Sequence, residues 1–224
     1  MDKRFPDKIV KPADCILAFG IPTSRDDFIK DIQTGDKDFA KTIKGGWFQY
    51  KTNIISNLRE ILAILENIGV TVIHRLTLED FGKLLNRNTA KVIILFSHWK
   101  EEPHHTNLKH AFNGSVEFHD GLKSPDEIIR RIPNNFSNML DLNVCRSKAL
   151  AEALKRTRPN CYFRRKIDVF ETGNGDEVKL DIMLHFYKIL LKHLARTSKT
   201  YFNAYMEVIE SFSKLFAGLE GRKP

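Results

Sequence analysis

Short apolar runs alternate along this chain with segments in which apolar residues recur every three or four positions. The runs predict buried strands, and the three- to four-residue spacing predicts amphipathic helices. The expected strands cover residues 15–21, 70–74, 92–98, 116–119, 139–145 and part of 161–170. The expected helices cover residues 53–68, 77–85, a segment that starts after 124, 147–154, 180–194 and 201–216. This order predicts an α/β fold, a three-layer sandwich with a mostly parallel central sheet flanked by helices.

Three helix ends carry a specific local signal. Thr77 is followed three residues later by Asp80, which is the spacing of a capping box. Ser124 and Pro125 are a good cap and a good first-turn residue for the next helix. Gly69 suits the C-terminal end of the helix that precedes it.

The 224 residues, with a mass of 25.9 kDa, contain no internal repeat and no linker rich in Pro, Gly or Ser. Residues 1–224 are therefore expected to form one domain, with a helical C-terminal part at about 180–216. The chain is 42% hydrophobic, which excludes a disordered or collagen-like protein. No apolar run approaches the roughly 18 residues that span a bilayer, and the first residues lack an apolar stretch. We expect a cytoplasmic protein without a membrane contact.

Positive charge exceeds negative charge, with 36 Lys and Arg against 28 Asp and Glu. Such a balance can favour nucleic acid or an acidic protein partner. The basic residues are not interleaved with aromatic ones as in a single-strand binding platform. We therefore expect a solvated basic surface, and contact with nucleic acid only indirectly if at all.

Two predicted strands end in chemically useful side chains, namely His98 and Cys145. If these strands are parallel neighbours, both side chains lie at the same sheet edge, where open α/β sheets bind their ligands. The imidazole can then take the proton of the thiol and create a nucleophile. The backbone N–H of Cys145 and a donor at or after Trp99 can stabilise an oxyanion. Alternatively, Cys145 is an inert core residue and His98 makes only a local hydrogen bond.

Other polar residues are weaker candidates. Asp120 and Asp141 are placed near the predicted cleft, where either can read a basic substrate side chain, or serve a turn and a strand-edge partner. Arg146 can bind a substrate carboxylate or form a surface ion pair. There is no His-Glu-x-x-His and no Cys-x-x-Cys pattern, so we expect no metal and no cofactor. The histidines between these segments are expected to form a solvated loop; they are His104, His105 and His110.

The segment 143–147, Asn-Val-Cys-Arg-Ser, resembles the Gln-Ala-Cys-Arg-Gly signature of caspases, and the separation of His98 from Cys145 is close to their roughly 50 residues. The order of motifs is more similar to the bacterial caspase-like CHAT peptidases. Asp120-Gly121 stands between the two strands, and Phe186-Tyr187 and an Ala204-containing last helix follow. The resemblance covers about residues 14–216. Trp99 stands where the family has Gly after its His.

The resemblance implies a cysteine endopeptidase with a His98–Cys145 dyad. It also implies a protein substrate, a role in bacterial defence or regulated cell death, and control by a separate regulatory or sensor protein. The alternative is a catalytically inactive caspase-like scaffold or adaptor that binds through its basic face or the helix 201–216. A weaker third possibility is a nucleotide- or nucleic-acid-binding α/β domain.

Overall fold

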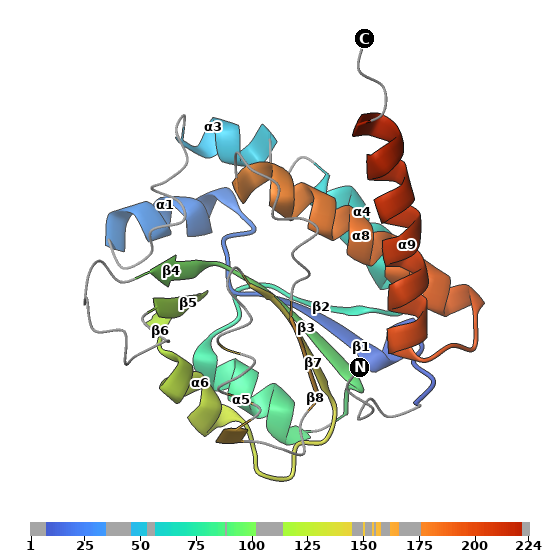
Figure 1. Cartoon of the computed structure of the whole chain (residues 1–224). Helices are drawn as coiled ribbons and strands as arrows, with labels where there is room; N and C mark the ends of the chain where they lie inside the picture. The colour runs from blue at the N-terminus through green and yellow to red at the C-terminus, as the bar shows by residue number, and fades with distance from the viewer. Residues whose placement is uncertain are drawn as a thin grey trace.

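A five-stranded sheet runs through the middle of the protein (Figure 1). The computed structural model describes residues 8–34, 46–52, 57–87, 89–101, 114–144, 150, 154, 156–157, 162–165 and 176–220. The strands are, in spatial order, β2 (Thr71–Ile73), β1 (Cys15–Phe19), β3 (Val92–Ser97), β7 (Met139–Val144) and β8 (Tyr162–Arg165). Every neighbouring pair is parallel. The predicted α/β fold with a mostly parallel sheet is confirmed.

The three central strands explain why the sequence shows them as continuous apolar runs. All residues of β1, β3 and β7 are buried, because both faces of the sheet are covered. Leu17 pairs with Ile94, and Ile94 pairs with Asp141 of the next strand. Since side chains alternate between the faces of a strand, each central strand contributes to two separate cores.

Within the described residues, five helices cover one face of the sheet, and they lie above it in Figure 1. They are α1 (Arg25–Thr34), α3 (Gly46–Tyr50), α4 (Leu58–Asn67), α8 (Asp176–Arg196) and α9 (Tyr201–Glu220). A short 3-10 turn, Pro12–Asp14, leads into β1. Apolar side chains of these helices, such as Leu65, Phe186 and Tyr205, pack on Leu17 and Phe96 of the sheet.

The opposite face carries α5 (Leu78–Arg87) and α6 (Pro125–Arg131). A second, antiparallel sheet lies beside them. Its strands are β4 (Trp99–Glu101), β5 (Gly114–Phe118) and β6 (Gly121–Lys123). Val116 and Phe118 of β5 join the core under this face, so the small sheet is fixed to the large one through shared packing.

The local predictions at three helix ends are confirmed. The Asp80 N–H donates to Thr77 Oγ1 at 3.0 Å, and the Thr77 hydroxyl donates to Asp80 Oδ2 at 2.8 Å. Ser124 caps α6 in a capping box with Glu127. Gly69 ends α4 with a φ of 97°, a conformation that glycine adopts without steric cost.

Two expectations were incomplete. The short strands β4 and β6 were not predicted, because three residues of mixed polarity carry no periodic signal. The predicted helix over 147–154 falls largely on residues outside those described. No helix within the described ranges combines the length and the apolar character needed to cross a bilayer.

Candidate active site

The carboxyl edge of the sheet is the natural place for a site, because ligands of open α/β sheets bind where the strand order reverses. In this sheet β2 lies on one side of β1, and the later strands β3, β7 and β8 lie on the other, so the strand order reverses at β1. His98 follows β3 directly at this edge. Its neighbour β7 runs in the same direction, and Ser97 of β3 pairs with Val144 of β7. Cys145, which follows Val144 in the sequence, and Arg146 lie outside the described residues.

The backbone at His98 is held by the small sheet. The Glu117 N–H donates to the His98 carbonyl at 2.9 Å, and the hydroxyl of Ser97 donates to the Glu117 carbonyl. These two hydrogen bonds tie the end of β3 to β5. His98 itself is half-buried, so part of its surface remains accessible to solvent.

Gly20 makes this arrangement possible. It follows β1, and its N–H donates to the Phe96 carbonyl at 2.9 Å. A Cβ atom on Gly20 would lie 2.2 Å from the Glu117 carbonyl oxygen, closer than any carbon can approach. The absence of a side chain at this position thus lets β5 lie directly against the ends of β1 and β3.

Trp99 continues directly into a strand. It pairs with Val116 in the antiparallel ladder of β4 and β5. Antiparallel ladders alternate bonded and non-bonded pairs, and the bonded pair here is His98–Glu117. The Trp99 N–H therefore points away from β5. An extended backbone does not require glycine, so a tryptophan at this position causes no backbone strain.

The structure gives Asp120 and Asp141 local partners. Asp120 Oδ1 accepts from the Leu78 N–H at 3.0 Å, at the start of α5, and Asp120 Oδ2 lies 3.2 Å from Lys123 Nζ. This fits the turn alternative. Asp141 is fully buried, three residues before the end of β7, and accepts from the Tyr201 hydroxyl at 2.8 Å. Asp141 is therefore an interior residue and does not belong to the carboxyl edge.

An ion pair at the same edge was missed by the sequence analysis. Asp27 of α1 is 3% exposed and accepts from Arg75 Nε at 2.6 Å and from the Ser24 hydroxyl at 2.7 Å. Burial alone would raise the pKa of Asp27, but the hydrogen bonds from Arg75 and Ser24 outweigh it and lower that pKa. Arg75 has a φ of 56°, in the left-handed region. The Ser24–Asp27 spacing is a capping signal that reveals the start of α1, whereas nothing in the sequence pairs Asp27 with Arg75.

The chain has two further thiols, Cys15 and Cys161. Cys15 is fully buried at the first residue of β1, on the amino edge of the sheet. Burial, together with the nearby Asp14 and Asp141, raises the pKa of its thiol. It is therefore an inert core residue. Cys161 lies outside the described residues, as do His104, His105 and His110, so the prediction that no metal binds there stays a prediction.

Comparison with known proteins adds no family. No protein-family model matches the chain, and no curated protein matches it. What can be concluded about activity must therefore come from the residues at the carboxyl edge.

Proposed function

We propose that this chain is a cysteine endopeptidase of the caspase-like CHAT type, with Cys145 as nucleophile and His98 as its proton-transfer partner. The observation that carries the proposal is the register of β3 and β7. The strands are parallel neighbours, and the paired residues Ser97 and Val144 directly precede His98 and Cys145 in the sequence. Neighbouring strands lie about 4.8 Å apart, a separation that a thiol and an imidazole can bridge.

The proposed reaction uses both groups in turn. The Cys145 thiolate forms a bond to the carbon of a substrate peptide carbonyl, and the carbonyl oxygen becomes an oxyanion. The C–N bond then breaks as His98 gives its proton to the leaving amine. Water attacks the resulting thioester, His98 accepts a proton from that water, and the thiol is regenerated with release of the carboxylate.

The backbone of Trp99 supports this reaction. Its N–H follows His98 and faces away from β5. In the proposed reaction this N–H donates to the oxyanion. Each such donor contributes about 10²–10³ to the rate of acyl transfer. The tryptophan side chain, which departs from the glycine of the family, therefore does not remove this backbone group.

The resemblance to the CHAT peptidases also suggests a substrate and a cellular role. The substrate is a protein, and the peptidase acts in bacterial defence or regulated cell death under the control of a separate protein. A regulated peptidase can be silent on its own, so the decisive test must not depend on turnover.

Thiol reactivity is such a test. The native chain is treated with iodoacetamide, and the labelling rate of each cysteine is followed by mass spectrometry as a function of pH. Cys145 should label at least about tenfold faster than Cys15, because a thiolate stabilised by imidazole reacts and a buried thiol does not. In the His98→Ala variant the rate at Cys145 should fall toward that of an ordinary thiol.

Cleavage supplies the second readout. Cys145→Ala should abolish cleavage of a denatured protein library, while Cys161→Ala serves as the matched control and retains it. Equal labelling of all three thiols, unaffected by His98→Ala, would contradict the peptidase and favour the non-catalytic scaffold.

A further inference from the structure

A residue with an unfavourable backbone conformation lies at the carboxyl edge of the sheet. Arg75, two residues after the end of β2, has a φ of 56°, and among the described residues it is the one non-glycine residue with a positive φ. A side chain disfavours this left-handed conformation, so it persists only where the surrounding structure holds it. The contacts of Arg75 and of the residue after it show what holds the conformation and what it achieves.

The Arg75 side chain is held by a buried carboxylate. Arg75 Nε donates to Asp27 Oδ1 at 2.6 Å, and the Ser24 hydroxyl donates to Asp27 Oδ2 at 2.7 Å. The side chain of Asp27 is 3% exposed, whereas that of Arg75 is 56% exposed. Asp27 is therefore fixed at the start of α1, and it anchors the guanidinium from its protein side.

The turn at Arg75 lets the next residue join two strands. The Leu76 N–H donates to the carbonyl of Phe19, the last residue of β1, at 2.9 Å. The Leu76 carbonyl accepts from the N–H of His119, the residue after β5, at 2.8 Å. Leu76 is fully buried, so both hydrogen bonds are shielded from water.

These hydrogen bonds lead to His98. The Glu117 N–H, two residues before His119 along the chain, donates to the His98 carbonyl at 2.9 Å. A continuous path therefore runs from Asp27 through Arg75, Leu76 and the end of β5 to His98. Every step of this path is a short hydrogen bond or a covalent connection of a few residues.

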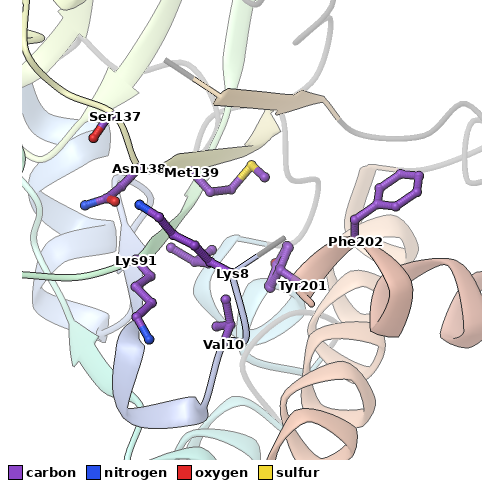
Figure 2. A pocket seen from close by; sticks show the side chains of 9 residues that line it. Lys8, Val10, Lys91, Ser137, Asn138, Met139, Tyr201 and Phe202 are labelled. Carbon is purple, nitrogen blue, oxygen red and sulfur yellow. The ribbon is translucent and has the colours of Figure 1, made fainter. Parts of the chain in front are cut away.

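The amino edge of the sheet, shown in Figure 2, is closed by packing instead. Val10, Met139 and Tyr201 are at most 5% exposed, and the ring of Phe202 turns away from them. The strained residue thus lies at the edge that carries His98, and not at the edge that the core closes.

We propose that Arg75 is a positioning residue for His98. Its pairing with Asp27 stabilises the left-handed turn, and the turn places Leu76 where it holds the end of β5 against the backbone of His98. Arg75 acts through this backbone conformation and does not itself touch the substrate. The catalytic meaning of this role rests on the proposed peptidase function, whereas the hydrogen-bonded path can be tested without any activity.

The test compares Arg75→Ala with Arg75→Gly, because both remove the guanidinium but only glycine adopts the left-handed turn without steric cost. Amide hydrogen exchange of the full chain is followed by NMR. In Arg75→Ala the amides of Glu117 and His119 should exchange at least about tenfold faster, while the amides of β3 keep their protection. In Arg75→Gly both rates should stay within about threefold of the wild type.

Thiol reactivity links the path to the site. The iodoacetamide labelling rate of Cys145 should fall toward that of the His98→Ala variant in Arg75→Ala, and Arg75→Gly should restore it. Arg59→Ala, which removes an exposed arginine of α4, should change neither the exchange rates nor the labelling. Labelling that does not depend on His98 in the wild type would contradict the peptidase, and the exchange rates would still decide whether the path exists.

Three results would overturn the positioning role. Equal losses in Arg75→Ala and Arg75→Gly would show that the guanidinium itself acts at the site. Unchanged exchange at Glu117 and His119 in Arg75→Ala would show that the turn does not hold β5. Faster exchange throughout β3 would show that Arg75 contributes to overall stability and does not position His98.

Discussion

The hydrogen bond between Tyr201 and Asp141 joins the first residue of α9 to the middle of β7. The carboxyl of Asp141 is fully buried, and Tyr201 is 3% exposed. Tyr201→Phe deletes only the hydroxyl and keeps the packing of the ring. A buried acceptor that loses its donor costs about 1–3 kcal/mol of unfolding free energy. In a protein of this size that corresponds to about 2–4 °C in Tm per kcal/mol.

Urea unfolding followed by circular dichroism, with linear extrapolation to water, measures the loss. The matched control is a double-mutant cycle with Asp141→Val. If the pair interacts as described, Tyr201→Phe should cost much less in the Asp141→Val background, because no buried carboxyl then lacks its donor. A loss below about 0.5 kcal/mol in the wild-type background, or an equal loss in both, would show that the hydrogen bond does not contribute to stability.

Further predictions concern Gly20 and Asp27. Gly20→Ala should destabilise the protein by about 1–3 kcal/mol or more, since its Cβ would meet the Glu117 carbonyl at 2.2 Å. Gly82 lies within α5, and a Cβ there would lie 3.4 Å from the flexible side chain of Arg131. Gly82→Ala should therefore be neutral or stabilising in the same urea assay. Equal losses of stability in the two variants would contradict this explanation. Asp27 has a lowered pKa in the folded state, so its stabilisation is present above the unfolded value of about 3.9 and is lost as pH falls below it. The stability difference between wild type and Asp27→Asn should therefore shrink in acid, whereas Asp26→Asn, at an exposed neighbour, should show a small difference at every pH.

The large sheet could be predicted because its strands are buried on both faces and therefore read as apolar runs. β1, β3 and β7 were all located to within two residues of their ends. Polar residues inside such a run were harder to interpret. The sequence places Asp141 near the predicted cleft and leaves open a substrate contact or a strand-edge partner. Its partner is Tyr201, 60 residues away along the chain. No local pattern reveals a hydrogen bond over that distance.

At the carboxyl edge, too, the strand could be predicted from the local pattern, but its contacts with distant residues could not. The position of His98 after a central strand followed from the apolar pattern alone. The contacts that fix it, from Glu117 and Gly20, depend on how a second sheet packs on the first. The two strands beside β5 are too short to leave a periodic signal, so this packing could not be foreseen.

The parallel order of the sheet has a consequence for how the chain reaches its native state. β1 pairs with β2 and β3, so Cys15 can pair only after Val92 has been synthesised. β3 in turn can pair with β7 only after Met139 has been synthesised. Each of these pairings closes a long loop before it gains any stabilisation. During synthesis the apolar segment 15–19 therefore stays without its sheet neighbours while a large part of the chain is made. We therefore expect slow refolding in vitro, because the strand order that brings β3 and β7 together requires several pairings between distant parts of the chain.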